Sequence, residues 1–232
     1  MIAMTLTCLP VAGFDCESTG TDVAHDRIVS AALVRRDADG TTITQTWLVN
    51  PGIEIPAAAL AVHGITTQRV RDEGQDAREA LDEIAQSLAD CLTDGLSVLI
   101  YNASFDLRIL DAELARHGLA SLERRLGGAV RPVVDPLVID RGVDRYRRGS
   151  RRLPDLMDVY GLPPSRHLHD ALDDVVNAIA VFDAIMNRYP ILPAAAHDLH
   201  DWQATAHREW ATHFNEWLAG RGQRPTADPR WP

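Results

Sequence analysis

The stretch GFDCESTG at residues 13–20 decides the fold, because it sets two acids at the end of an apolar segment. A strand over residues 11–17 would place the side chains of Asp15 and Glu17 on one face of a sheet and that of Cys16 on the other. Two carboxylates that point the same way repel each other unless protons or cations lie between them. A bare Asp-x-Glu is also typical of a solvated strand end, so the remaining sequence has to decide between these interpretations.

The composition is that of an ordinary globular protein of 232 residues, 46% hydrophobic and 24% charged, long enough for one domain and an extension. Its net charge of -10 argues against a general nucleic-acid-binding protein, which would have a basic surface. The charge is compatible with a nuclease that contacts its substrate over a small area and has an acidic, metal-binding site. No run approaches the ~18 apolar residues of a membrane span, and we expect no signal peptide and no membrane contact. Three cysteines are too few for a disulfide framework, which favours a reducing, cytoplasmic setting.

The order of predicted elements indicates an α/β fold with a mixed sheet, since three early strands precede alternating helices and strands. We expect the strands at 11–17, 27–36, 41–50, 97–101 and 133–134, and helices at 57–63, 77–91, 104–117, 153–160, 171–189 and 197–218. Prolines 190 and 193 mark a boundary. We therefore predict a main domain at 9–189, a C-terminal helical extension at 190–219 and a flexible tail at 220–232.

Two further acidic stretches lie at predicted helix starts. YNASFD (residues 101–106) puts Asp106 in the first turn of a helix after a buried strand, and HDALDD (residues 169–174) carries Asp170, Asp173 and Asp174. Acids are favourable at a helix N-terminus for purely structural reasons, so neither stretch alone indicates a site.

Taken together, the three stretches resemble the motifs of the DEDDh 3'-5' exonucleases, a family that includes the proofreading subunit of bacterial replicative polymerases. The family's F-D-x-E-T-T-G appears at 14–20 with Ser18 where Thr is usual, N-A-x-F-D appears at 102–106, and H-x-A-x-x-D appears at 169–174. The VHGIT stretch at 62–66 and RLPDLMDVYGL at 152–162 also resemble family features. The ordered set covers roughly residues 9–189, which makes it far more specific than a lone Asp-x-Glu.

The resemblance implies a ribonuclease-H-like exonuclease fold with a mixed five-stranded sheet. It implies hydrolysis of phosphodiester bonds at nucleic-acid 3' ends by a two-metal mechanism that releases nucleoside monophosphates. Such chemistry needs hard oxygen ligands for two Mg²⁺ ions, which Mn²⁺ can replace. The residues that match the metal ligands are Asp15, Glu17, Asp106 and Asp174, and His169 matches the general base. Asp173 competes with Asp174 for the last position, which the family spacing gives to Asp174.

Substrate contacts are implied for Ser18, Thr19, His63 and Asn102, although a local helix-end role is equally open for His63. The substrate would be a 3' end, with single-stranded DNA favoured and RNA possible, or the chain would be a non-catalytic polymerase-accessory or nucleic-acid-binding module. Six arginines at 141–152 could hold phosphates or belong to a solvated loop. The aromatic C-terminal helix would contact a polymerase or a second copy of the chain, or pack on its own domain.

Overall fold

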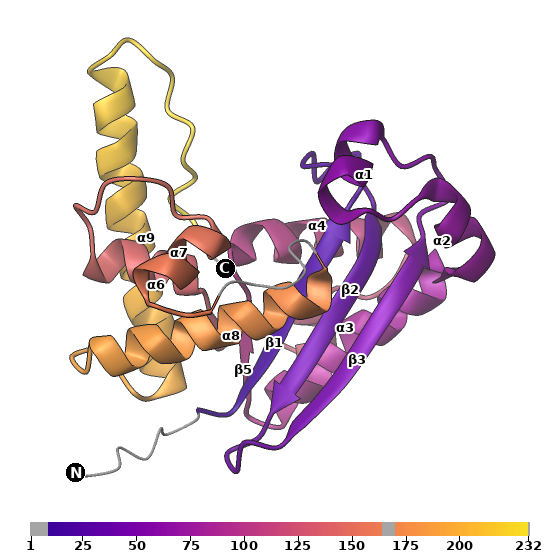
Figure 1. Cartoon of the computed structure of the whole chain (residues 1–232), viewed down its shortest axis with the longest axis horizontal. Helices are drawn as coiled ribbons and strands as arrows, with labels where there is room; N and C mark the ends of the chain where they lie inside the picture. Colours follow the sequence, from indigo (N-terminus) through magenta and orange to yellow (C-terminus); the bar gives the residue numbers. More distant parts are fainter. Residues whose placement is uncertain (1–8, 164–169, 232) are drawn as a thin grey trace.

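The structure is a computed structural model that describes residues 9–163 and 170–231. Its sheet has the strand order β4-β3-β2-β1-β5-β6, and the first three strands form an antiparallel meander at its centre. Figure 1 shows helices lying against both faces of this twisted sheet. The strands are β1 Val11–Ser18, β2 Ile28–Arg36, β3 Thr42–Asn50, β4 Gln75–Asp76, β5 Ser97–Leu99 and β6 Val133–Val134. The predicted mixed α/β sheet flanked by helices is confirmed.

The predicted strand number of five is wrong by one, because β4 adds a short parallel pairing beside β3. Both residues of β4 are exposed and polar, so no apolar alternation marks them as a strand. Asp76 also accepts hydrogen bonds from the backbone N–H groups of Arg78 and Glu79, which makes it the N-cap of the next helix. The sequence signal at this position is that of a helix start.

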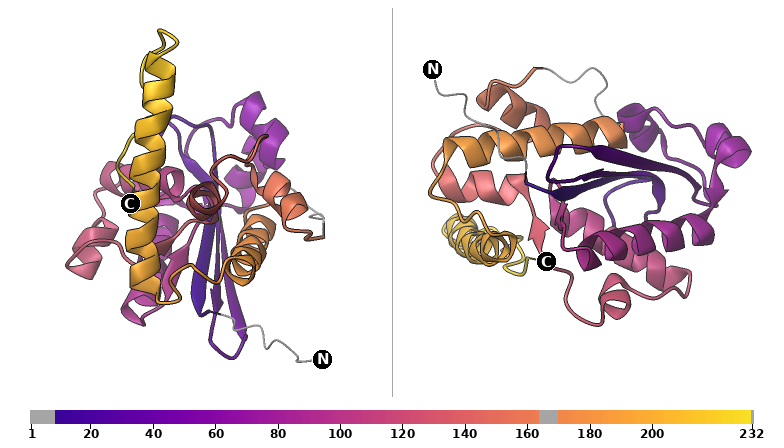
Figure 2. Two further views of the ribbon diagram at one scale, coloured as in Figure 1. Left: turned by 90° about the vertical axis from the view of Figure 1, so that its left-hand side faces the viewer. Right: turned by 90° about the horizontal axis from the view of Figure 1, so that it is seen from below.

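The alternation of β1 divides the core into two layers. Ala12, Phe14 and Cys16 face a cluster that includes α3 (Ala77–Thr93) and α4 (Ala103–Arg116). Val11 faces the opposite cluster, which contains α8 (Ala171–Arg188). Figure 2, in its right-hand view, shows α8 on one side of the sheet and α3 on the other. Asp15 and Glu17 follow Val11 at intervals of two and therefore belong to the α8 face.

The remaining helices are short and lie at the ends of the strands. These are α1 Ala57–His63, α2 Thr67–Glu73, α5 Leu122–Leu126, α6 Pro136–Val143 and α7 Leu153–Val159. The sequence analysis missed α2, α5 and α6, which have only five to eight residues and so offer little periodicity. Among the described helices, none is long and apolar enough to span a membrane.

The C-terminal helix α9 (Ala196–Ala219) covers β6 at the edge of the sheet. It stands as a column beside the main body in Figure 2, left. The segment after it returns along the helix, where Asn215 hydrogen-bonds Ala227 and His207 Nε2 lies 2.9 Å from the carbonyl oxygen of Asp228. Flexibility of this tail and the domain boundaries at 189 and 219 stay predictions.

Candidate active site

Two acids at the end of β1 meet the first turns of α8. Gly13 lies on the same face of β1 as Asp15 and lets α8 approach closely, because a Cβ there would lie 2.7 Å from Val175 Cγ1. The N-cap Asp170 accepts a hydrogen bond from the backbone N–H of Leu172 and so fixes where α8 begins. This start places the next acidic residues of α8 over the end of β1.

The structure brings Asp15, Glu17 and Asp174 together, with one carboxylate oxygen from each within 4.8 Å of the others. All three side chains are partly buried. Asp174 takes part in this group, and its neighbour Asp173 does not. We refer to these three residues as the carboxylate cluster.

Asp106, the fourth predicted ligand, lies beside the cluster on the first turn of α4 and is 3% exposed. Its Oδ1 accepts a hydrogen bond from the backbone N–H of Cys16 at 3.1 Å and contacts Cys16 Sγ at 3.3 Å. These contacts attach α4 to β1 between the two acids of the strand. The charge of Asp106 also raises the pKa of Asp15.

The environment of the site raises the pKa values of its acidic side chains. Burial, followed by repulsion from Asp106, Glu17 and Asp174, raises the pKa of Asp15 well above its usual range. Burial and the charge of Asp174 raise the pKa of Glu17 from 4.5 to about 7. Burial raises the pKa of Asp106 to about 7, against the opposing effect of its hydrogen bonds from Cys16. Without a cation, these carboxyl groups would therefore hold protons near neutral pH.

This set of carboxylate ligands is suited to a hard divalent cation. Clustered carboxylate oxygens are what Mg²⁺ and Mn²⁺ prefer in proteins, and a dication removes the repulsion that otherwise raises the pKa values. Asp15, Glu17 and Asp174 would hold such an ion, and Asp106, which is hydrogen-bonded to the residue between Asp15 and Glu17, would be the fourth acid of the site. The predicted general base, His169, lies outside the described residues.

Asn102 begins the helix that carries Asp106, in a left-handed conformation with φ of 67°. Asparagine tolerates this region better than most residues, which explains its place in the turn. Its side chain is exposed, so it is available to a ligand. The backbone N–H groups of Asn102 and Ala103 donate to the two carboxylate oxygens of the buried Asp135, at 3.1 and 3.0 Å.

Asp135 is a supporting residue that the sequence analysis missed. It is 1% exposed, and it also accepts a hydrogen bond from the backbone N–H of Leu137 at the start of α6. The signal was an acid directly before Pro136, which is typical of a helix N-cap. Nothing in the sequence indicated that the same carboxylate also holds the N-terminus of α4.

The other predicted substrate contacts lie around the cluster and make local bonds. Ser18 Oγ donates to the carbonyl oxygen of Gly20 at 2.6 Å, and Thr19 Oγ1 donates to Asp26 at 2.8 Å. His63 Nδ1 accepts the backbone N–H of Ile65, which is the local role left open for it. His63 also lines a hollow of about 260 Å³ together with residues 170–172 at the start of α8. Their contacts with substrate stay predictions.

The arginine-rich segment at 141–152 is largely structural. Arg147 and Arg151 form ion pairs with the fully buried Asp140, which also accepts a hydrogen bond from the Tyr160 hydroxyl. Arg141 differs, because its guanidinium lies over the ring of Trp210 at 4.1 Å from the centroid. The sequence could not separate these roles, since all six arginines look alike in a basic loop.

Comparison with known proteins gives the context of this site. A model of the RNase T family, described as exonuclease, matches residues 12–182. A DNA polymerase III subunit epsilon-like protein of Rhodobacter capsulatus is 31% identical over 78% of this chain and 24% of its own length. A PolC-type DNA polymerase III of Lacticaseibacillus paracasei is 26% identical over 66% of this chain and 10% of its own.

Solved structures of exonuclease I share the fold. The Escherichia coli enzyme in complex with a dA16 oligonucleotide matches 86% of this chain and 44% of that chain, with a TM-score of 0.69 and 22% identity. Exonuclease I from Methylocaldum szegediense matches 90% of this chain and 46% of that chain, with a TM-score of 0.65 and 25% identity. The chain thus spans a quarter or less of these curated relatives and less than half of the solved chains.

Proposed function

The chain belongs to the RNase T exonuclease family, and we propose that it is a divalent-metal-dependent enzyme that removes nucleotides from the 3' ends of single-stranded DNA. Hydrolysis of each terminal phosphodiester bond would release a nucleoside monophosphate. The DEDDh subtype, the 3'-5' direction and the metal mechanism are parts of this proposal. The match over residues 12–182 contains every residue of the site.

The observation that carries the proposal is the carboxylate cluster itself. Three acids from β1 and α8 have oxygens within 4.8 Å of one another in a partly buried position, where their charges are costly without a cation. A structural role would be served better by apolar or hydrogen-bonded neutral side chains. A site for Mg²⁺ or Mn²⁺ explains why acids occupy all three positions.

Each residue would have a separate task in hydrolysis. When bound, a pair of dications lowers the pKa of the attacking water and stabilises charge on the leaving 3' oxygen. Asp15, Glu17 and Asp174 would hold the ions, and Asp106 would join them from α4. His169 would accept the proton of the water, since a neutral imidazole is basic near pH 7. Its place in the motif directly precedes the helix that supplies Asp174.

Single-stranded DNA is the favoured substrate because the similar proteins are DNA polymerase III chains and an exonuclease I bound to a DNA oligonucleotide. Asn102 and His63 line two separate hollows and would contact the terminal nucleotide, with Ser18 and Thr19 at the end of β1. Exoribonuclease activity is the alternative, since discrimination at the 2'-OH depends on one or two contacts. Contact with a polymerase or a second copy stays a prediction.

The test uses 5'-labelled single-stranded DNA and RNA oligomers with Mg²⁺, Mn²⁺ or EDTA. We expect a ladder that shortens from the 3' end, is faster on DNA, and disappears with EDTA. Asp174→Asn should abolish it, whereas the matched control Asp173→Asn, one residue away and outside the cluster, should retain it. Equal loss in both variants would contradict the assigned ligand. Absence of cleavage by the wild-type chain with either ion would contradict the enzyme itself and favour a non-catalytic binding module.

A further inference from the structure

A groove of about 690 Å³ runs beside the candidate active site. Its walls come from α4, α6, α9 and the segment that returns along α9, and we call it the α9 groove. Six of its lining residues carry the argument: Asn102, Arg108, Arg141, Trp210, Arg230 and Trp231. Asn102 connects the groove with the site, because it starts the helix whose first turn carries Asp106.

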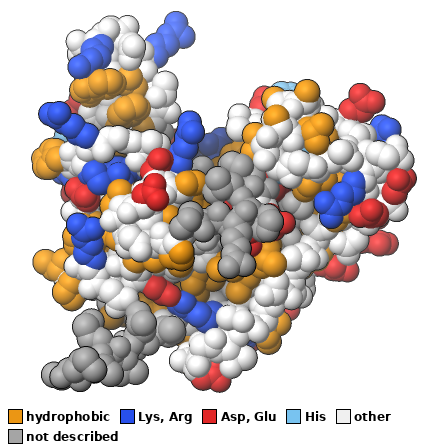
Figure 3. Space-filling view, in the orientation of Figure 1, with side chains coloured by type: hydrophobic (Ala, Val, Ile, Leu, Met, Phe, Trp, Pro, Cys, Tyr) orange, Lys and Arg blue, Asp and Glu red, His pale blue; other side chains and the backbone are white. Residues whose placement is uncertain are grey.

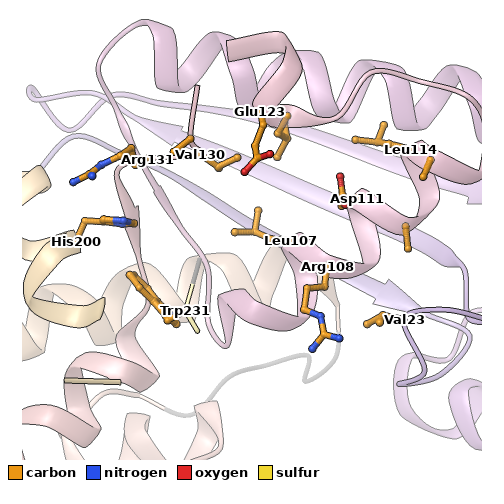
Figure 4. A pocket seen from close by; sticks show the side chains of 14 residues that line it. Val23, Leu107, Arg108, Asp111, Leu114, Glu123, Val130, Arg131, His200 and Trp231 are labelled. Atoms are coloured by element: carbon orange, nitrogen blue, oxygen red, sulfur yellow. The ribbon is translucent and has the colours of Figure 1, made fainter. Parts of the chain in front are cut away.

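Two arginines of the groove lack a carboxylate partner. Neither Arg108 nor Arg141 forms an ion pair or a hydrogen bond with another residue in the described part of the chain. Arg230, in contrast, pairs with Asp228 at 2.8 Å. Glu123 also lines the groove, but Figure 4 shows Arg108 extending away from Glu123 and Asp111. The groove therefore contains two guanidinium groups without a direct ion-pair partner in the described part of the chain, although Asp135 and Asp140 act on the charge of Arg141, and Arg108 acts on Asp228, at longer range.

Arg141 is the more constrained of the two. It is partly buried, and its guanidinium lies 4.1 Å from the centroid of the Trp210 ring, which limits its motion. Burial lowers the pKa of Arg141, which indicates that its charge is poorly hydrated. A positive group that is held in place and contacts no carboxylate directly has donors left for an anion from outside the chain.

Aromatic rings accompany these charges. Trp210 stacks on Phe214 with 5.4 Å between ring centroids, and Trp231 lies 5.1 Å from the ring of His200. Trp231 lines both the α9 groove and a neighbouring, mostly apolar pocket of about 540 Å³, whose lining is shown in Figure 4. Proteins that hold single-stranded nucleic acids combine such rings with arginines along the backbone of the strand.

The charge of the outer surface is also suited to a single-stranded nucleic acid. Figure 3 shows basic side chains, all arginine in this lysine-free chain, at the bottom of the hollow between α9 and the lobe that carries α1. The chain as a whole has a net charge of -10, so this local excess of positive charge is not a general property of its surface. A polyanion would be attracted to these side chains.

We propose that the α9 groove binds the single-stranded DNA on the 5' side of the nucleotide being released, with Arg108 and Arg141 on its phosphates. The inference rests on the proposed function, and it adds a binding surface built partly by α9 and the segment behind it. Those elements lie beyond the family match, which ends at residue 182. The groove would make hydrolysis depend on substrate length.

The test compares Arg141→Ala with Arg221→Ala as its matched control. Arg221 also lies over an indole, at 3.9 Å from the Trp217 ring, but does not line the groove. Binding of a fluorescent 12-nucleotide DNA is measured in Ca²⁺ at several salt concentrations. We expect Arg141→Ala to weaken binding about tenfold. The slope of log affinity against log salt should fall by about 0.7, the value for one lost phosphate contact on a single strand.

A second experiment distinguishes loss of DNA binding in the groove from loss of hydrolysis at the active site. Hydrolysis of a dinucleotide, which would contact the groove only at its Asn102 end and not at Arg141, should proceed at the wild-type rate in Arg141→Ala, and Arg141→Lys should keep most of the salt dependence. Equal affinities of Arg141→Ala and Arg221→Ala for the 12-mer would overturn the proposal, as would loss of dinucleotide hydrolysis in Arg141→Ala. A wild-type chain that hydrolyses neither substrate contradicts the proposed function, whereas the binding data test the groove alone.

Discussion

Replacing Glu17 by Gln should stabilise the metal-free protein, although it removes a proposed ligand. Glu17 is partly buried beside Asp174 and Asp106, and this environment raises its pKa from 4.5 to about 7. In the unfolded chain the carboxyl group ionises freely, so folding must either bind a proton or bury an unfavourable charge. Glutamine fills nearly the same space without that charge.

The pH range follows from the direction of the pKa change. Below pH 4.5 the carboxyl group is protonated in both states and contributes nothing. Between 4.5 and about 7 the unfolded chain releases its proton while the folded chain retains it, so stability falls as pH rises. Above this range the loss is constant, and at ~1.4 kcal/mol for each pKa unit it amounts to about 3 kcal/mol.

Urea unfolding in EDTA at pH 4 and pH 8 measures the effect. We expect Glu17→Gln to match the wild type at pH 4 and to exceed it by about 3 kcal/mol at pH 8. Saturating Mg²⁺ should stabilise the wild type at pH 8 and leave the variant nearly unchanged, because the ion replaces the missing proton. A variant that is less stable than the wild type in EDTA at pH 8, or equally affected at both pH values, would refute the reasoning.

Three other substitutions test how the site is positioned. Gly13→Ala places a methyl group 2.7 Å from Val175 Cγ1, so it should cost about 1–3 kcal/mol and weaken the thermal shift by Mg²⁺, whereas Gly128→Ala, with no atom within 4 Å, should do neither. Gln203→Leu should cost about 3 kcal/mol in urea unfolding, because it leaves backbone groups at the sheet edge without partners. Asp140→Asn should cost about 3–5 kcal/mol by the same assay, because two arginines lose a fully buried partner, and unchanged stability would contradict that role.

Part of the carboxylate cluster could be predicted from sequence because the relation between Asp15 and Glu17 is local. Alternation along one strand puts Asp15 and Glu17 on one face, and the helix that begins within the third motif supplies Asp174. What joins them in space is Gly13, whose missing side chain lets α8 lie against β1. A single glycine in a strand has several structural explanations, so nothing in the sequence selects this one.

The buried face of α9 could not be predicted from its apolar pattern. The pattern pointed to a stripe of large aromatics, yet Trp217 is 50% exposed while His200 and Gln203 are buried at 7% and 0%. The reason is that α9 covers a sheet edge, where backbone groups need hydrogen-bond partners. The side-chain amide of Gln203 accepts from the N–H of Asp135 at 2.7 Å and donates to the carbonyl oxygen of Val133 at 3.2 Å.

Gln203 thereby hydrogen-bonds the backbone at the sheet edge, as a neighbouring strand would. These bonds also support a residue that positions part of the candidate active site. The residue that it holds, Asp135, binds the first two backbone N–H groups of the turn into α4, which carries Asp106. A helix outside the matched segment thus supports the second motif through two consecutive hydrogen bonds. Removal of α9 should therefore disturb Asp106 before it disturbs the pairing of β1 with β2, because that pairing makes no contact with Gln203.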